Sequence, residues 1–125
     1  MIFGIGVDLI EIERVETNLR EHGERFEEKV FTPTERGYCR RMPLPAQHYA
    51  ARFAAKEAFL KALGTGWARG ITWQDVGIEN LPSGMPRLVI SGRALELARE
   101  YGVTQMHVTL SHSRGHAVAV VVLEK

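Results

Sequence analysis

A chain of 125 residues is long enough for one domain with a real hydrophobic core. Apolar residues make up 45% of it and charged residues 25%, ordinary globular values, and the formal net charge of +1 argues against a dedicated nucleic-acid binder. The single cysteine, Cys39, excludes an internal disulfide and a metal site built from several cysteines.

No targeting or membrane segment is expected. The N-terminal residues 1–4 contain no basic region followed by an apolar run, so they do not resemble a signal peptide. The apolar run at 117–123 is too short to cross a bilayer. We therefore expect a soluble, cytoplasmic protein that forms a single domain over residues 1–125.

The first stretch, residues 2–9, predicts a strand with two unlike faces. One face carries only apolar side chains, and the other carries Gly4, Gly6 and Asp8. Two glycines leave open space beside a carboxylate, and they weaken a strand unless something approaches closely there. Asp8 also has the chemistry of a helix N-cap, so it either caps the following helix, faces a ligand, or does both.

Three helical segments follow. Apolar residues at helical spacing predict an amphipathic helix over about 10–21, and Phe26 with Val30 indicates a further short turn. The sequence Thr32-Pro33-Thr34-Glu35 is a capping box with proline at the first helical position. It predicts a helix that ends near Arg41, before a stiff connection with two prolines.

Residues 52–63 predict the helix around which the chain is organised. Ala54, Ala58 and Ala62 lie on one side of it and would let another backbone approach closely, and Gly64 ends the helix. Its charged residues lie between apolar strips rather than on one solvent face, as the i, i+4 pairs Arg52–Lys56 and Glu57–Lys61.

The second half of the chain alternates between short strands and one helix. A glycine-rich basic loop covers 65–70, and the expected strands are 71–73, 76–79, 87–90, 106–111 and 117–123, with a helix from Ser91 to about Tyr101. The last strand lacks alternation after Val120, so we expect it to be buried on both faces. The fold class is therefore α+β, with a mainly antiparallel sheet packed against several helices.

Two acidic residues lie in unusual settings, Asp8 on a glycine-lined strand face and Glu57 in a mostly apolar helix. Two carboxylates are too few for Ca²⁺ but suit Mg²⁺, which keeps several waters and shares phosphate oxygens with a substrate. Several basic residues could line a phosphate pocket: Arg52, Lys56, Lys61, Arg69 and Arg114. The pattern favours metal-assisted phosphoryl chemistry.

Several blocks of this sequence, taken in order, resemble the bacterial holo-[acyl-carrier-protein] synthases. They are Gly4–Asp8 with Glu11 and Arg14, Phe31–Glu35, Arg52–Gly66, Ser83–Pro86 and His107–His112. The length is that of the short, trimeric branch of the 4′-phosphopantetheinyl transferases. The resemblance implies transfer of 4′-phosphopantetheine from coenzyme A (CoA) to a serine of apo acyl carrier protein, in support of fatty acid biosynthesis.

The resemblance also implies roles for individual residues. Asp8 and Glu57 match the Mg²⁺ ligands, and Lys61 is placed to reach a phosphate or the incoming serine. The proton acceptor is either Glu57 or a metal-bound water. The positions that match CoA contacts, including the 3′-phosphate contacts Arg52 and His112, are Arg52, Lys56, Lys61, Gly64, Ser83, Gly84, Pro86 and His112.

Partners follow from the same resemblance. Arg14 and Arg25 match positions that dock the acidic carrier protein, although many nearby glutamates dilute the basic character. A homotrimer with CoA pockets between subunits is implied, with neither nucleic acid nor membrane as a partner.

Two alternative functions remain. One is a non-catalytic CoA- or nucleotide-binding module on this fold. The other is a small metal-dependent nuclease, which would need more clustered acids and a basic groove.

Overall fold

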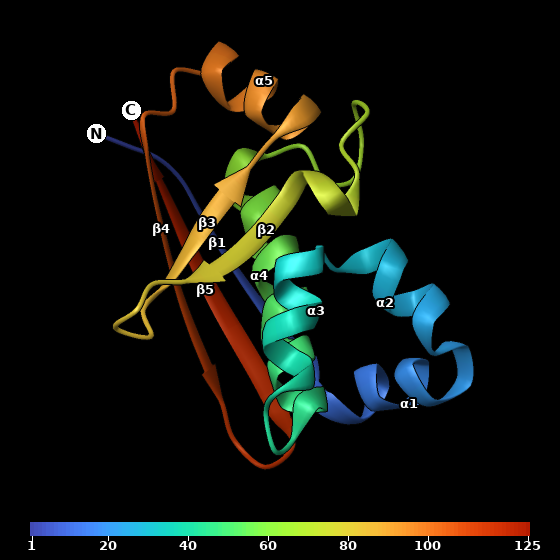
Figure 1. Cartoon of the computed structure of the whole chain (residues 1–125). Helices are drawn as coiled ribbons and strands as arrows, with labels where there is room; N and C mark the ends of the chain where they lie inside the picture. The colour runs from blue at the N-terminus through green and yellow to red at the C-terminus, as the bar shows by residue number, and fades with distance from the viewer.

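The computed structural model describes all residues, 1–125, and arranges them as two sheets with helices covering one side of the larger sheet (Figure 1). In chain order the elements are β1 (Ile2–Glu11), α1 (Ile12–His22), α2 (Glu24–Val30), α3 (Pro33–Arg40), α4 (Pro45–Leu63), the 3₁₀ helix η1 (Trp73–Asp75), β2 (Val76–Asn80), β3 (Pro86–Ile90), α5 (Gly92–Glu100), β4 (Gln105–His112) and β5 (His116–Glu124). The larger sheet has the order β1-β5-β4, the smaller is the hairpin β2-β3, and every pairing is antiparallel. The predicted α+β class is confirmed, with the strands divided between two sheets.

The two ends of the chain lie side by side at one end of the larger sheet (Figure 1). The amino group of Met1 donates a hydrogen bond to the Lys125 carbonyl at 2.9 Å, and the Lys125 amide donates to the Met1 carbonyl at 2.8 Å. Strand β1 pairs with β5 along its length, from Ile2 opposite Glu124 to Glu11 opposite His116. The first and last segments therefore form one long antiparallel pair.

Helix α4 packs against β1 at unusually close range, through glycines on the strand and alanines on the helix. A β-carbon on Gly4 would overlap the carbonyl oxygen of Ala62. A β-carbon on Gly6 would overlap the carbonyl oxygen of Ala58 and lie 2.8 Å from the amide nitrogen of Ala62. The space that the sequence predicted beside the glycines is thus filled by the helix backbone, and the alanine side of the helix is confirmed as a close-packing surface.

Helix α4 is buried on most of its circumference, which explains why its apolar residues do not form a single stripe. The sheet covers its alanine side, while α1, α3 and β2 contact other sides. Arg52 and Lys56 are buried and Glu57 is half-buried, whereas Lys61 is exposed. Neither α4 nor any other helix combines the length and the apolar content needed to span a membrane.

Several local predictions are confirmed and others are wrong. The Thr32–Glu35 capping box is present, with the Glu35 amide donating to the Thr32 hydroxyl at 3.2 Å. Helix α4 begins at Pro45 rather than near Arg52, because a proline at the first helical position starts a helix as readily as it interrupts one. Residues 71–73 form no strand; a second capping box, between Thr72 and Asp75, bends the chain into η1.

The start of α1 also differs from the prediction. Strand β1 continues to Glu11, opposite His116, so the helix begins at Ile12 and Glu11 occupies the N-cap position. Asp8 therefore caps no helix and stays within the strand. Of the two uses that the sequence left open for this carboxylate, helix capping is excluded, and facing a ligand stays a prediction.

The expectation that β5 is buried on both faces is wrong for the single chain. Burial along β5 alternates, with Ala117, Ala119, Val121 and Leu123 buried and the intervening residues only partly covered. The outer face of the sheet has nothing packed on it, and it continues into exposed apolar residues of β1, namely Ile5, Val7 and Leu9. Strand β5 is apolar from Ala117 to Leu123, yet one of its faces is not covered within this chain.

Replacing Gly6 with alanine tests the close contact between α4 and β1. Because the new methyl group would meet helix backbone rather than a flexible side chain, Gly6→Ala should lower the free energy of unfolding by more than about 3 kcal/mol. Gly115→Ala is the matched control, since no heavy atom lies within 4 Å of the added carbon. Chemical denaturation measures both, and equal stability of the two variants would contradict the packing.

Candidate functional site

The strand–helix contact brings Asp8 beside the charged side of α4. Gly4 lies against Ala62 and Gly6 against Ala58, so each step of two residues along β1 moves about one turn back along α4. Asp8 is the next residue on that strand face. The Lys61 ammonium donates to the Asp8 carboxylate and to the Val7 carbonyl, at 3.0 Å in each case.

Glu57 is the second carboxylate that the sequence assigned to the site. It precedes Lys61 by one helical turn, so both residues project from the same side of α4. The indole nitrogen of Trp67, in the loop after α4, donates to the Glu57 carboxylate at 3.1 Å. Trp67 in turn packs against Trp73, with ring centroids 3.9 Å apart and ring planes tilted by 40°, so the orientation of Glu57 is supported by an aromatic pair.

The donor set of this cluster fits a magnesium ion that is shared with a substrate. Asp8 and Glu57 supply hard carboxylate oxygens, and no group of three or more acidic, histidine or cysteine side chains is arranged so that it could hold a metal ion by itself. A cation held by two carboxylates must complete its shell with water or substrate oxygens, as Mg²⁺ does at phosphate sites. Asp8 and Glu57 are the residues that would hold it.

A second cluster lies around a cavity of about 200 Å³ between the N-terminal half of α4, the β2-β3 turn and the end of β4. Four of the residues that the sequence assigned to CoA line it together: Arg52, Gly84, Pro86 and His112. The others in its lining are Tyr38, His48, Ala51, Asn80 and Leu110. No acidic side chain is among them, so the cavity suits an anionic ligand.

Arg52 is the most unusual residue of this cavity, since its exposed fraction is only 2%. Its guanidinium donates to the His48 carbonyl at 3.1 Å and to the Asn80 side-chain oxygen at 2.7 Å, and it lies 4.3 Å from the centre of the Tyr38 ring. Its Nε is buried without a partner, and no carboxylate pairs with it. A buried cation with an unsatisfied donor is costly unless a ligand completes its bonding.

Three other residues assigned to CoA lie outside this cavity. Ser83 is in the β2-β3 turn, where its hydroxyl accepts a hydrogen bond from the Met85 amide at 3.4 Å. Gly64 follows α4 with a φ of 85°, which lets the chain turn into the loop that carries Trp67. Lys61 projects toward Asp8 instead, as described above.

Lys56 does not fit the predicted role in CoA binding, because it is fully buried and its ammonium is already satisfied. It pairs with the buried Glu35 carboxylate at 2.8 Å and donates to the carbonyls of Trp73 and Val76, at 3.1 and 2.6 Å. Burial lowers the pKa of Lys56, and Glu35 opposes that effect. This ion pair joins α3, α4 and the start of β2, so Lys56 serves the fold.

Sequence reasoning missed four residues of the two clusters. Tyr38, His48 and Asn80 reach the cavity from three different elements, and Trp67 reaches Glu57 from a loop. Apart from its position one helical turn before Arg52, nothing in the sequence sets His48 apart from a surface histidine. Burial, followed by the charges of Arg52 and His112, lowers the pKa of His48.

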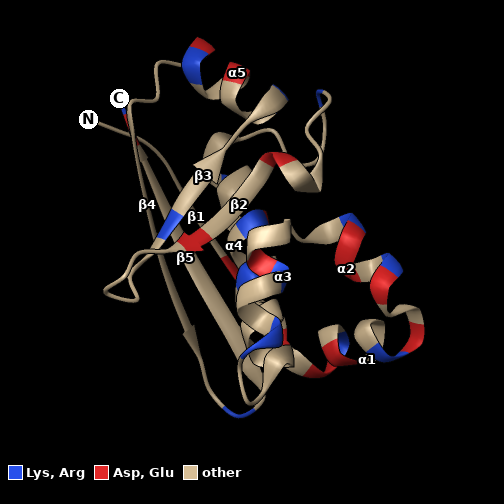
Figure 2. Ribbon diagram, viewed as in Figure 1, with Lys and Arg blue, Asp and Glu red and all other residues tan.

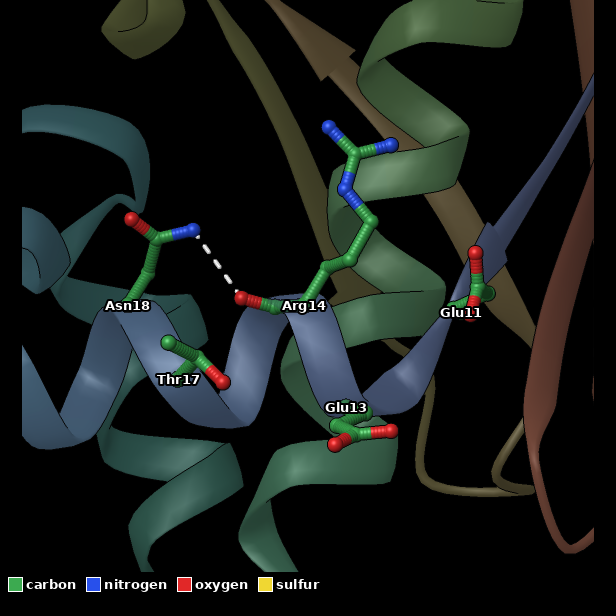
Figure 3. Close-up of a pocket in the computed structure, with 5 residues that line it drawn as sticks. All are labelled: Glu11, Glu13, Arg14, Thr17 and Asn18. Atoms are coloured by element: carbon green, nitrogen blue, oxygen red, sulfur yellow. Dashed lines mark hydrogen bonds between the residues drawn. The ribbon is translucent and has the colours of Figure 1, made fainter.

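The two arginines assigned to carrier docking lie on the exposed side of α1 and α2. Arg14 lines a hollow of about 380 Å³ with Glu11, Glu13, Thr17 and Asn18, and Figure 3 shows its side chain pointing away from Glu13. Arg25 lines a neighbouring hollow of about 270 Å³ that also includes Asn18. Neither arginine forms an ion pair, although acidic and basic residues alternate along both helices (Figure 2).

Helix α2 is held in place by polar contacts with side chains from α3, α4 and η1. Arg40 of α3 binds the Glu27 carboxylate through two nitrogens, each at 3.1 Å, and the Tyr49 hydroxyl of α4 donates to the same carboxylate. The Gln74 amide donates to the carbonyls of Glu28 and Phe31, both at 2.8 Å. The position of Arg25 is therefore fixed by residues from α3, α4 and η1.

Comparison with known proteins defines the class of this fold and site. A model of the 4′-phosphopantetheinyl transferase superfamily matches residues 4–121, which include both clusters. The chain therefore belongs to this superfamily.

Within the superfamily, the chain is similar over its whole length to holo-[acyl-carrier-protein] synthases. It is 50% identical over 124 residues to that of Syntrophus aciditrophicus (strain SB), covering 99% of this chain and 97% of the relative. The Neisseria meningitidis synthase has a crystal structure that matches with a TM-score of 0.90 and 33% identity over 100% of both chains. The Helicobacter pylori synthase, solved in complex with coenzyme A, matches with a TM-score of 0.85 and 29% identity over 96% of this chain and 99% of that one. The family resemblance in the sequence is thereby confirmed.

Proposed function

We propose that this chain transfers the 4′-phosphopantetheine group from coenzyme A to a serine hydroxyl of apo acyl carrier protein. The observation that carries the proposal is a pair of features along α4: the Lys61–Asp8 pair with Glu57 one turn before the lysine, and a buried arginine that lacks an anion. CoA has a phosphate group for each of them: its pyrophosphate suits the first and its 3′-phosphate suits the second.

In the reaction the serine oxygen forms a bond to the phosphorus of the phosphopantetheine arm. The bond to adenosine 3′,5′-bisphosphate breaks, and the serine proton goes to a base.

The residues of the first cluster would position the pyrophosphate and the serine. Asp8 and Glu57 would hold a magnesium ion, which when bound neutralises the pyrophosphate and improves the leaving group. Lys61, exposed beside Asp8, would reach a phosphate oxygen or the incoming serine. The proton acceptor is either Glu57, which the hydrogen bond from Trp67 orients, or a water.

The residues of the second cluster would bind the other end of CoA. Arg52 and His112 would contact the 3′-phosphate, and the turn with Gly84 and Pro86 would lie beside the adenine. The missing partner of the Arg52 Nε supports this assignment, because a phosphate oxygen is a strong acceptor for a guanidinium.

The direct test is to incubate the protein with CoA, Mg²⁺ and an apo carrier protein, and to measure the mass of the carrier. A gain of one phosphopantetheine per carrier, dependent on CoA, is the expected result. The alternative that the sequence left open, a non-catalytic CoA-binding module, would bind CoA and leave the carrier mass unchanged.

Asp8→Asn and Glu57→Gln should each reduce transfer by at least about a hundredfold, since each removes a charge from the proposed Mg²⁺ site while keeping the size of the side chain. The rate of carrier modification and the far-ultraviolet circular dichroism should be measured together. Glu100→Gln is the control, an exposed carboxylate of α5 without an ion pair. Full activity in either site variant would contradict the assignment.

Arg14 and Arg25 are the proposed contacts for the acidic carrier. Both are exposed and free of ion pairs, so an incoming carboxylate would not have to displace a glutamate. Arg14→Ala should raise the KM for the carrier about tenfold and leave the affinity for CoA unchanged. Arg99→Ala, at the exposed end of α5, is the control. A parallel loss of CoA affinity in Arg14→Ala would contradict this division of roles.

A homotrimer with CoA pockets between subunits is the proposed assembly. Glu57 follows Arg52 by five residues, so the two side chains project about 140° apart around α4 and lie on opposite flanks of the helix. One CoA that spans both clusters is accommodated more readily when they come from neighbouring chains. The uncovered outer face of the large sheet, with Ile5, Val7 and Leu9 each more than half exposed, offers the apolar surface for such contacts.

Ile5→Glu should dissociate the assembly, because it places a charge in the middle of that apolar face. Analytical ultracentrifugation should show a trimer for the unaltered chain and a monomer for the variant. Leu44→Glu is the matched control, since Leu44 is 64% exposed and Ile5 is 61% exposed, but Leu44 lies outside the sheet. A trimer that survives Ile5→Glu would place the contact surface elsewhere.

A further inference from the structure

His48 lines the basic cavity together with Arg52 and His112. It is on α4 one turn before Arg52, and its backbone carbonyl accepts a hydrogen bond from the Arg52 guanidinium at 3.1 Å. Its ring is half-buried and meets the His112 ring edge to face, with centroids 5.6 Å apart. On the other side the ring contacts Tyr38, with centroids 5.9 Å apart.

The side chains that face His48 are basic or neutral. Arg52 comes from its own helix and His112 from β4, while Tyr38 from α3 and Asn80 from β2 contribute neutral polar atoms. No carboxylate lines the cavity or acts on the His48 ring. In the free protein, burial and these two basic neighbours lower the pKa of His48, so the ring is neutral at neutral pH.

A bound dianion would reverse this balance. Two negative charges beside Arg52 would favour the charged form of a histidine ring that lines the same cavity. Arg52, which lines the cavity and has no carboxylate partner, is the cation beside which such an anion would bind.

We infer that His48 is a specificity-determining residue for a phosphomonoester: when the dianion binds beside Arg52, His48 takes up a proton and adds a positive charge to the lining around it. The inference rests on the proposed function, in which this phosphomonoester is the 3′-phosphate of CoA. It adds that the affinity for CoA is linked to pH and that His48 helps to distinguish CoA from its 3′-dephosphorylated form.

The sign of the pH dependence separates this site from one that uses arginine alone. A phosphomonoester has a second pKa near about 6, and a permanently charged site favours the dianion, so binding would release protons and strengthen as the pH rises. Histidines that become charged on binding take up protons instead. Their contribution is gained below the raised pKa of the complex and weakens as the pH rises through it.

The first test needs no substitution. Calorimetric titration of the full chain with CoA, and separately with 3′-dephospho-CoA, is carried out with Mg²⁺ in two buffers of different ionisation enthalpy. We expect CoA to bind with net proton uptake and to weaken by up to about tenfold per pH unit between about pH 6.5 and 8, and dephospho-CoA to show neither effect. Proton release with CoA, or equal uptake with both ligands, overturns the inference.

The second test is His48→Phe, which keeps an aromatic ring against Tyr38 but cannot take up a proton. Near pH 6.5 the preference for CoA over dephospho-CoA should fall about tenfold, with smaller proton uptake. His22→Phe, an exposed histidine at the end of α1, is the matched control and should behave like the unaltered chain.

The outcomes distinguish the inference from the proposed function. If His48→Phe keeps the CoA preference and the proton uptake of the unaltered chain, the inference fails and the proposed function stands. If the unaltered chain binds neither ligand, the proposed function fails and the inference fails with it. If His48→Phe does not fold, the proton uptake of the unaltered chain decides the question.

Discussion

The approach of α4 to the backbone of β1 is the contact on which the rest of the structure depends. It requires Gly4 and Gly6 on the strand and backbone atoms of Ala58 and Ala62 on the helix, with no room for a methyl group between them. This contact sets the level of Asp8 along the helix and lets Lys61 reach its carboxylate. The first cluster is therefore a consequence of backbone packing between segments about 50 residues apart in the sequence.

Two buried cations on α4 illustrate how structural and functional charges differ. Lys56 has one carboxylate and two carbonyls of its own chain around it, so its burial is compensated and it joins α3 to β2. Arg52 has a carbonyl, an amide oxygen and an aromatic ring, but no anion, and one of its nitrogens has no partner. Both side chains are almost completely buried. They differ in their hydrogen-bond acceptors: Lys56 is satisfied by groups of its own chain, whereas Arg52 lacks an anion, which a ligand would supply.

Much of this arrangement could be read from the sequence where a local rule operates. The Thr32–Glu35 capping box, the alternating faces of β1 and the alanine side of α4 each depend on residues that are close in the chain. The roles of Lys56 and His48 could not, because they depend on partners from other elements: Glu35 satisfies the lysine, and His112 and Tyr38 surround the histidine. The turn at η1 differs from the predicted strand for another reason: it is local, and the bond from the Thr72 amide to the Asp75 carboxylate overrides the apolar pattern of residues 71–73.

The reciprocal hydrogen bonds between Met1 and Lys125 have a practical consequence for how this polypeptide can be cut and rejoined. Since the two ends already meet, a linker of a few residues would connect them without moving β1 or β5. New ends opened at the exposed β4-β5 turn around Gly115 would leave the buried helix intact. We therefore expect the same fold from a circularly permuted chain, in which the elements occur in a different order along the sequence.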